Sequence, residues 1–444
     1  MTELTGWGRY PRHPSDVLSP SSPPAVPPLM NSHVGLVARG NGRAYGDAAI
    51  GERVTLVTRG LDRIRAFDPS TGRVRVEAGI LLSSLLDVVV ARGFFPPVVP
   101  GTKYVTIGGM IASDVHGKNH HRDGGFGDHV ESLILAMPDG DILPCSRTEN
   151  RDLFRATIGG MGLTGTILEA TFHLRPIETG WMRQETVVAP NLERTLEALR
   201  ASRDSTYSVA WIDCLARGQS LGRSLIYAAE HATRHDLEAL LPAAEAFPPS
   251  RSWRLSVPLD FPSLTLNRAS VAAFNEVHFR AGAMRSGYPF LVHWNRYFFP
   301  LDGIGDWNRI YGRRGFLQYQ CVIPTARASS ALGGILDRIS QRGQASFLAV
   351  LKQMGPSHGD LSFPMEGFTL ALDIPVNDLA FPLLDELDLM VVEAGGRLYL
   401  AKDARQSPCT FEAGYSALGR FRDLRRAIGA TGRISSRLST RLGI

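Results

Sequence analysis

A glycine-rich segment early in the chain has the residue types and spacing of a phosphate-binding loop. It reads Ala38-Arg39-Gly40-Asn41-Gly42-Arg43-Ala44-Tyr45-Gly46-Asp47 and follows a short apolar strand expected at 34–37. Its glycines let the backbone turn sharply, so that several N–H groups point at one spot and bind anionic oxygens. Arg39 or Arg43 would add charge-assisted hydrogen bonds. The spacing is not the GxGxxG of a nicotinamide-binding helix, and the loop alone is equally well interpreted as a plain turn.

Two further glycine-rich segments favour a nucleotide. The first, 99–113, contains Pro100-Gly101-Thr102 and then Thr106-Ile107-Gly108-Gly109. A glycine pair at the start of a small-residue helix lets a flat ring or a pyrophosphate lie against the backbone. The second, 159–167, is a glycine-dense turn that leads into a strand and has room for an adenine. Each segment alone is compatible with tight packing, but several in one domain favour a dinucleotide.

Three histidines lie within six residues, in Asp114-Val115-His116-Gly117-Lys118-Asn119-His120-His121. A metal site is disfavoured because His120 and His121 are adjacent and face apart, and no Cys or Glu cluster accompanies them. We therefore expect no metal. The segment is interpreted as a polar loop that lines a substrate cavity, with His120 and His121 as hydrogen-bonded structural residues.

The loops must be positioned by an α+β framework, and 444 residues predict two domains. In the first part of the chain, a helix is expected at 81–91 and strands at 54–57, 74–77, 132–137, 142–145 and 164–174. The five prolines within residues 15–31 predict an extended surface connection without a regular helix.

From about residue 178 to residue 396, longer helical segments alternate with strands. Apolar spacing predicts helices at 192–202, 235–247, 329–341 and 378–393, and strands at 316–323, 346–352 and 369–374. This pattern predicts an antiparallel sheet covered on one face, with the other face free to roof a site. Gln318 and Gln320, at i and i+2, would point two amides to one side, which suits sugar hydroxyls or a solvent-facing edge. The strand at 397–401 and a helix near 415–428 are expected to return to the first domain.

Composition limits the classes of partner and compartment. The formal charge is only +5, and much of it lies in the C-terminal arginines, interpreted as a solvated helix face in preference to contact with anionic lipid or a phosphate-bearing substrate. No aromatic-basic platform accompanies the charge, so no nucleic acid is expected. Four scattered cysteines without CxxC spacing predict neither zinc nor a disulfide framework and indicate a reducing compartment. We expect neither a signal peptide nor a membrane-spanning segment.

The order of these loops resembles the vanillyl-alcohol-oxidase type of FAD-binding fold. Longer blocks resemble one branch, the flavin subunits of decaprenylphosphoryl-β-D-ribose 2′-epimerase, which are 2′-oxidases. The blocks are Leu4-Thr5-Gly6-Trp7-Gly8-Arg9, Gly42-Arg43-Ala44-Tyr45-Gly46-Asp47, Val115-His116-Gly117-Lys118-Asn119-His120-His121, Phe316-Leu317-Gln318-Tyr319-Gln320 and Ala401-Lys402-Asp403. The likeness runs nearly end to end. Residues 15–33 depart from it, being Pro-rich where the branch has a helix.

The resemblance implies an FAD-binding domain at 1–178, a substrate-binding domain at 179–396 and a C-terminal return at 397–444. Related flavoproteins often bond a His covalently to the flavin at the place of Arg43 and Ala44, so a non-covalent FAD is implied. The implied cofactor-binding residues are Arg39, Gly40, Asn41, Gly42, Arg43, Ala44, Tyr45, Gly46, Asp47, Gly101, Thr102, Thr106, Gly108, Gly109, Ser113, His116, Gly117, Ile167 and Tyr399. The implied substrate-binding residues are Lys118, Trp211, Tyr297, Gln318, Gln320, Lys352 and Lys402.

The implied reaction is oxidation of a secondary sugar hydroxyl. A hydride leaves carbon for the flavin while the hydroxyl proton goes to a base. Lys402 is the first candidate, either as a base with a lowered pKa or as a charge that stabilises a developing anion. His116 and Tyr45 are the second candidates, as base or as hydrogen-bond donors to the flavin.

Three functions remain open at this stage. The first is oxidation of a polyprenyl-phosphoryl-β-D-ribose at C2′, with a short-chain NAD(P)-dependent reductase completing the epimerisation. The second is oxidation of another sugar, alditol or aldonolactone, and the third is non-catalytic binding of FAD or a sugar phosphate. The expected location is cytoplasmic, with peripheral contact at the inner face of the membrane.

Overall fold

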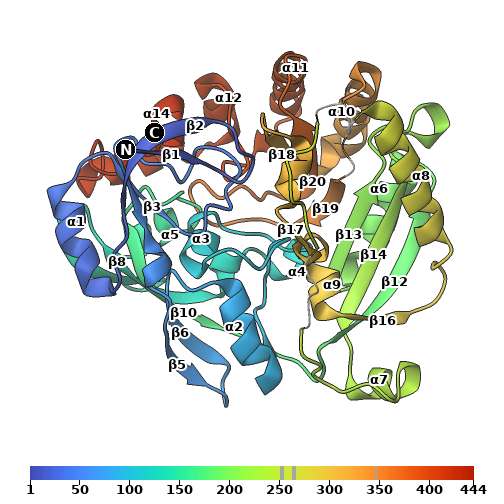
Figure 1. Ribbon diagram of the computed structural model, residues 1–444, viewed down its shortest axis with the longest axis horizontal. Helices are drawn as coiled ribbons and strands as arrows, with labels where there is room; N and C mark the ends of the chain where they lie inside the picture. Colours follow the sequence, from blue (N-terminus) through green and yellow to red (C-terminus); the bar gives the residue numbers. More distant parts are fainter. Residues whose placement is uncertain (251–254, 263–266, 345, 347) are drawn as a thin grey trace.

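The computed structural model describes residues 1–250, 255–262, 267–344, 346 and 348–444. They form two lobes, with both chain termini in the left-hand lobe of Figure 1 and the largest sheet in the right-hand lobe. The architecture is mixed α+β, as the sequence predicts.

Two sheets build the first lobe. The smaller has the order β1-β2-β4-β3, and its strands are β1 (Thr2–Thr5), β2 (Arg12–Leu18), β4 (Val54–Val57) and β3 (Leu36–Arg39). The larger is antiparallel in the order β5-β6-β10-β8-β9, formed by β5 (Ile64–Asp68), β6 (Arg73–Glu77), β10 (Thr166–His173), β8 (Val130–Ala136) and β9 (Ile142–Ser146). The helices are α1 (Val26–Ser32), α2 (Leu82–Val89), α3 (Ile107–Ala112), α4 (His120–Asp123) and α5 (Arg151–Thr157).

An eight-stranded antiparallel sheet dominates the second lobe. Its order is β16-β12-β14-β13-β19-β20-β18-β21, and the strands are β16 (Phe290–His293), β12 (Trp181–Ala189), β14 (Ser224–His231), β13 (Tyr207–Ile212), β19 (Ala349–Met354), β20 (Gly367–Pro375), β18 (Phe316–Pro324) and β21 (Arg397–Leu398). The helices are α6 (Leu192–Ala201), α7 (Arg234–Leu240), α8 (Arg268–Ala283), α9 (Trp294–Phe298), α10 (Ala328–Arg342) and α11 (Ala380–Glu393). Two two-stranded pairs complete the set: β11 (Arg175–Pro176) with β7 (Phe94–Phe95), and β15 (Leu255–Ser256) with β17 (Ile304–Gly305).

Helices α6, α10 and α11 cover one face of the large sheet, as its pattern predicts. The other face is not wholly free, because α8 packs against β12 and β14 there and its His278 contacts Trp211 and Tyr227. Leu317 and Tyr319 of β18 pack in the apolar core with the buried faces of α6, α10 and α11. The alternating residues Gln318 and Gln320 point to the opposite face and line a cavity. The period of two along each strand therefore separates the core from the site.

The C-terminal segment returns to the first lobe after β21, one strand later than the sequence suggests. Leu398 still pairs within the large sheet. The helices α12 (Pro408–Gly414), α13 (Leu418–Ala427) and α14 (Arg437–Leu442) then share a core with β3, β4 and α1. Figure 1 shows α12 and α14 in the lobe that contains β1 and β2. The domain boundaries at 178 and 396 stay predictions.

Two expectations about helices are wrong. Residues 15–31 include all of α1 except its last residue. The prolines are tolerated because Pro27 and Pro28 occupy the first turn, where the missing N–H groups have no helical acceptor to lose. The expected helix 235–247 ends at Leu240, since Pro242 disfavours helical geometry at the residue before it. Residue 347 of the expected strand 346–352 lies outside the described residues.

The C-terminal arginines are only partly a solvated face, because Arg420 and Arg426 are exposed and the others are buried or half-buried. Arg425 is buried and donates to the carbonyl oxygens of Leu163, Ala430 and Ile434. Arg420 pairs with Asp360, and Arg433 donates to the carbonyl oxygens of Pro138 and Asn31. Much of the positive charge near the C-terminus is therefore used inside the molecule.

Candidate active site

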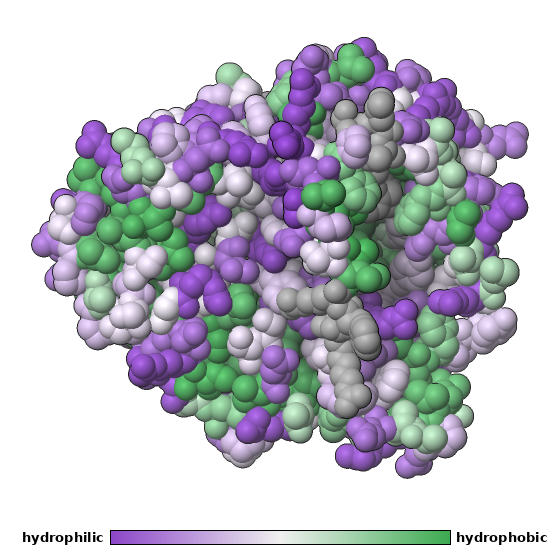
Figure 2. Space-filling view, viewed as in Figure 1, coloured by the Kyte–Doolittle hydropathy of each residue, from purple (hydrophilic) through white to green (hydrophobic). Residues whose placement is uncertain are grey.

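A cavity of about 930 Å³ lies between the glycine-rich loops of the first lobe and the face of the large sheet that carries Gln318 and Gln320. This volume is at the upper end of the range for small-molecule and cofactor sites. In the space-filling view, the surface is hollowed over the strands of the large sheet (Figure 2). The segments that line the cavity are far apart in sequence and include 38–49, 99–118, 161–167, 296–320 and 399–402.

The glycine-rich loops pack so closely against neighbouring segments that a side chain at Gly40 or Gly46 would push them apart. A Cβ at Gly40 would lie 2.1 Å from Thr106 Oγ1, and a Cβ at Gly46 would lie 1.9 Å from the carbonyl oxygen of Asp403. The N–H of Tyr45 donates to the carbonyl oxygen of Ala401 at 2.9 Å. The loop 38–47, the segment 99–113 and the C-terminal segment around residue 402 therefore meet at one wall of the cavity.

The lining fits a dinucleotide such as FAD. Across the described residues, the N–H groups of Gly40, Asn41 and Gly42 form no hydrogen bond to the protein, so they are available to phosphate oxygens. A Cβ at Gly101 would meet no atom within 4 Å, and one at Gly109 would meet only Thr106 Oγ1 at 3.0 Å. The glycines thus leave open the space that a flat ring system needs.

Most of the residues expected at the cofactor lie on the cavity. They are Gly40, Asn41, Gly42, Arg43, Ala44, Tyr45, Gly101, Thr102, Thr106, Gly108, Gly109, Ser113, His116, Gly117, Ile167 and Tyr399. Arg39, Gly46 and Asp47 lie outside the lining. The guanidinium of Arg39 instead donates to the carbonyl oxygens of Thr5 and Ala49.

Asp47 has a structural partner from the end of the chain. Arg441 of α14 donates to both of its carboxylate oxygens, at 3.1 and 2.9 Å, and to Asp403 at 2.9 Å. Both carboxylates are almost fully buried. Asp47 lies two residues after Tyr45, and Asp403 directly follows Lys402. The clamp that Arg441 forms with these two carboxylates therefore holds together the segments that carry Tyr45 and Lys402.

Replacing Arg441 by methionine is expected to lower the free energy of unfolding by about 3–5 kcal/mol, since two buried carboxylates lose their cation. Thermal or denaturant unfolding of the purified protein measures this loss. The matched control is Arg437→Met on the same helix, which breaks a more exposed ion pair with Glu52 and should cost about 1 kcal/mol or less. Equal losses in the two variants would contradict the clamp.

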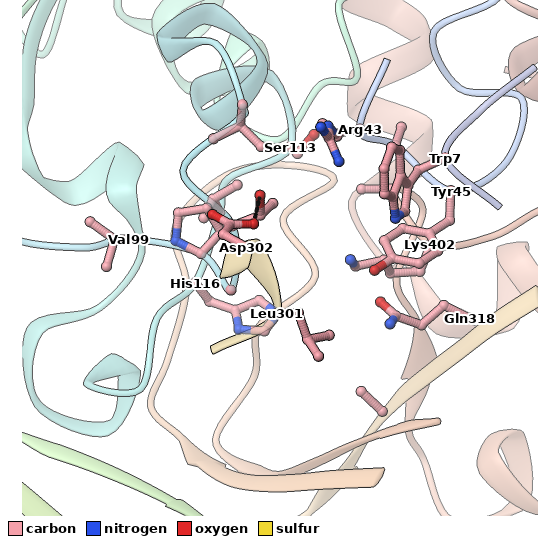
Figure 3. A pocket seen from close by; sticks show the side chains of 18 of the residues that line it. Trp7, Arg43, Tyr45, Val99, Ser113, His116, Leu301, Asp302, Gln318 and Lys402 are labelled. Carbon is pink, nitrogen blue, oxygen red and sulfur yellow. Dashed lines mark hydrogen bonds between the residues drawn. The ribbon is translucent and has the colours of Figure 1, made fainter. Parts of the chain in front are cut away.

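Lys402 lies beside the ring of Tyr45. Its Nζ is 3.8 Å from the ring centroid, and Figure 3 shows both residues with Trp7 and Gln318 on one side of the cavity, opposite His116 and Asp302. Burial lowers the pKa of Lys402 to about 7, against the opposing effect of the Asp373 carboxylate. Asp373 accepts a hydrogen bond from Gln318 Nε2 at 2.6 Å.

His116 joins two of the residues expected at the substrate. Its Nε2 lies 3.0 Å from Gln320 Nε2, and its Nδ1 lies 3.0 Å from Lys352 Nζ. Burial, followed by the charge of Lys352, holds the pKa of His116 well below its ordinary value. The imidazole is therefore neutral.

The remaining expected substrate residues also line the cavity. Lys118 donates to the carbonyl oxygen of Tyr297, and its Nζ lies 3.9 Å from the centroid of that ring. Trp211 packs edge-on against His278, with ring centroids 4.6 Å apart. Lys118 from the segment before α4, Trp211 from β13 and Tyr297 from α9 thus form one part of the cavity wall.

His120 and His121 have structural contacts, as expected. His120 Nδ1 accepts a hydrogen bond from the N–H of Gly355, and His121 Nε2 contacts the carbonyl oxygen of Ser205. They lie in the short helix α4, not in a loop. Among the described residues, no group of three or more His, Cys, Asp or Glu is arranged to hold a metal ion.

Sequence reasoning missed several lining residues. Trp7 lies under the guanidinium of Arg43, 3.7 Å from its ring centroid. Asp302 accepts hydrogen bonds from the Thr102 hydroxyl and the Lys103 N–H, both at 2.7 Å. The unusual block 4–9 was a usable signal for Trp7, whereas nothing near Asp302 in the sequence marks it.

Comparisons with known proteins agree with this geometry. Residues 29–146 match the FAD binding domain family. The chain is 36% identical, over 99% of its length and 97% of the relative, to a decaprenylphosphoryl-beta-D-ribose oxidase of Mycolicibacterium smegmatis. An uncharacterized Streptomyces coelicolor protein is 34% identical over 82% of the chain and all of that protein. Mouse L-gulonolactone oxidase is 30% identical over only 36% of the chain and 37% of the relative.

Proposed function

The chain belongs to the family of FAD-binding oxidoreductases that includes decaprenylphosphoryl-beta-D-ribose oxidase, and from this premise we propose that it oxidises C2′ of a polyprenyl-phosphoryl-β-D-ribose. The product is the 2-keto sugar, the first half of an epimerisation to the arabinose. That the protein is an FAD-dependent oxidoreductase follows from the family itself.

The observation that carries the proposal is the cavity, which joins the glycine-rich loops to a wall of amines and amides. Lys118, Lys352 and Lys402 line it with Gln318 and Gln320. Amides suit the hydroxyls of a sugar, and amines suit its phosphoryl group or its reacting oxygen.

FAD, when bound, supplies the acceptor for the hydride. In this proposal the glycine-rich loops, Arg43 and Tyr399 would hold the non-covalent cofactor. The amides of Gln318 and Gln320 orient the sugar so that the C2′ hydrogen faces the cofactor. Lys402 provides a charge near the reacting centre, and Tyr45 holds that ammonium over its ring.

An exposed apolar strip beside the cavity suits the lipid part of the substrate. Phe274 of α8 lines the cavity and is also 48% exposed, and Val277 and Met284 continue outward at 69% and 75% exposure. We assign this strip to the polyprenyl chain, because it is continuous with the cavity. The same strip supports peripheral contact with a membrane, while among the described residues no helix is long and apolar enough to cross one.

Two finer assignments complete the proposal. A short-chain NAD(P)-dependent reductase would reduce the keto sugar, because this chain's chemistry ends at oxidation. The four cysteines are unpaired, which supports a reducing location at the cytoplasmic face of the membrane.

The second candidate is oxidation of another sugar, alditol or aldonolactone. L-gulonolactone oxidase is similar over only about a third of the chain, whereas the ribose oxidase is similar over nearly all of it, so the lipid-linked ribose is favoured. Anaerobic bleaching of the flavin is the test. Polyprenyl-phosphoryl ribose should bleach it rapidly and free alditols or lactones slowly, and the reverse order would favour the second candidate.

A further inference from the structure

Lysine is rare in this chain and is concentrated at the cavity. The sequence has four lysines against 44 arginines, and three of the four lysines line the cavity. Arginine stays charged in proteins, whereas a buried lysine readily loses its proton. The chain thus uses arginine for nearly all of its cationic side chains but has lysines at the cavity, where a group that can gain and lose a proton can take part in catalysis.

A chain of hydrogen bonds leads from β20 to one of these amines. The hydroxyl of Thr369 donates to the carbonyl oxygen of Cys321 at 2.8 Å. That hydroxyl therefore accepts from Gln320, whose Nε2 lies 3.1 Å away, and the contact fixes the orientation of the amide. The other hydrogen of the same NH2 group points at His116 Nε2, 3.0 Å away.

The polarity of this chain determines the tautomer of His116. Because Nε2 accepts from Gln320, the single proton of the neutral imidazole lies on Nδ1. Nδ1 faces Lys352 Nζ at 3.0 Å, so its N–H needs a lone pair there. An ammonium at Lys352 has no lone pair, so its N–H groups would face the Nδ1–H of His116 without an acceptor between them.

We propose that Lys352 is the base that takes the proton of the sugar hydroxyl, and that Thr369, Gln320 and His116 hold it as a neutral amine. This inference rests on the proposed function. Lys352 interacts electrostatically with four neighbouring groups, and all four are basic: His116, His120, Lys118 and Lys402. Burial lowers the pKa of Lys352 to about 7.

The other two cavity lysines face an acceptor or an aromatic ring, although burial lowers the pKa of both to about 7, as it does for Lys352. Lys402 lies over the Tyr45 ring and is stabilised as an ammonium by the carboxylate of Asp373. Lys118 donates to the carbonyl oxygen of Tyr297 and lies over its ring. Lys352 is the cavity lysine that faces a hydrogen-bond donor, which separates the role of base from the role of electrostatic stabiliser.

The chemical step balances with these groups. The hydrogen on the carbinol carbon leaves with its bonding electron pair to oxidised FAD, which is reduced by two electrons. The O–H bond breaks, its electron pair forms the carbonyl, and its proton bonds to the lone pair of Lys352 Nζ. In this step Thr369, Gln320 and His116 act as positioning residues, because they fix the hydrogen-bonding state of Lys352 and take no proton themselves.

The protonation state of Lys352 can be measured without any sugar. Brief labelling of the FAD-loaded protein with acetic anhydride at a series of pH values, followed by peptide mass spectrometry, reports each of the four lysines. We expect Lys352 to become reactive through about pH 7. Thr369→Val should move that midpoint up by about one pH unit, because the amide of Gln320 is released. Thr369→Ser should restore it, and Thr157→Val, which alters a buried hydroxyl away from the cavity, should leave it unchanged.

Kinetics of flavin bleaching by the lipid-linked ribose give the second readout. The neutral fraction of Lys352 grows as pH rises through about 7, so the bleaching rate should rise there. Lys352→Met and Lys352→Arg should both lose this rise and slow bleaching about 10²–10⁴-fold, because neither side chain accepts a proton. Lys402→Arg should keep the rise.

The assignment is overturned if Lys352 stays protonated through neutral pH, if Thr369→Val leaves its midpoint in place, or if Lys352→Arg retains the pH-dependent rise. If the wild-type flavin is bleached by no lipid-linked sugar, the proposed function fails instead. The labelling experiment still decides the state of Lys352 in that case, so the two failures are distinguishable.

Discussion

Gly109→Val is expected to abolish FAD binding in a chain that still folds. Gly109 is the third residue of α3 and lines the cavity. An added Cβ there would meet only Thr106 Oγ1, at 3.0 Å, so the valine methyl groups would project into the open space. They would occupy space that the proposed cofactor needs beside this backbone. The measurement is the ratio of flavin absorbance to protein absorbance after purification and dialysis against excess FAD.

The matched control is Gly419→Val. Gly419 is in the helix α13, and a Cβ there would meet no atom within 4 Å. This substitution makes the same chemical change in a helix away from the cavity, so the variant should keep its full complement of FAD. Full flavin content in Gly109→Val, with circular dichroism unchanged, would contradict the placement of the cofactor against this loop.

Lys402→Met is expected to keep FAD but to slow anaerobic bleaching by substrate about 10²–10³-fold, the usual effect of losing one group that stabilises developing charge. The Nζ of Lys402 contacts the Tyr45 ring and is stabilised as an ammonium by Asp373. Loss of the cation also removes the countercharge of Asp373, whose pKa burial raises to about 7. The midpoint potential of the bound flavin should therefore fall, because a nearby positive charge favours the form that carries added electrons.

The control for this variant is Lys402→Arg, which keeps the charge. It should retain most of the midpoint potential while losing part of the rate, since the guanidinium has a different shape. A midpoint potential equal in all three proteins would place Lys402 away from the flavin and would leave it a substrate contact only.

Local pattern was enough to predict the face of the large sheet that carries the site. Gln318 and Gln320 alternate with apolar neighbours, and period-two geometry alone puts them on one side. The helices at 192–202, 329–341 and 378–393 were predicted to within two residues because each buries a regular apolar stripe. By contrast α8 was missed, since it buries only Val271 and Asn275 and shows little periodicity.

The convergence of the loops was predictable only through the family resemblance. No spacing rule connects residues 38–47 with 399–402, although Tyr45 hydrogen-bonds Ala401 across the cavity wall. Asp302 meets Thr102 from 200 residues away, and Arg441 meets Asp47 from 394 residues away. Such contacts depend on tertiary packing and leave no local signal. The proline-rich segment 15–31 gave a strong local signal that was wrong. Its prolines predicted no helix, but prolines in a first turn are compatible with one.

The central claim is that this cavity brings C2′ of a lipid-linked ribose to the flavin. The most direct test is stopped-flow bleaching of the anaerobic, FAD-loaded protein with polyprenyl-phosphoryl ribose carrying deuterium at C2′ or at C3′. The account predicts that deuterium at C2′ slows bleaching and that deuterium at C3′ does not. Slowing by the C3′ label alone, or no bleaching by either substrate, would contradict it.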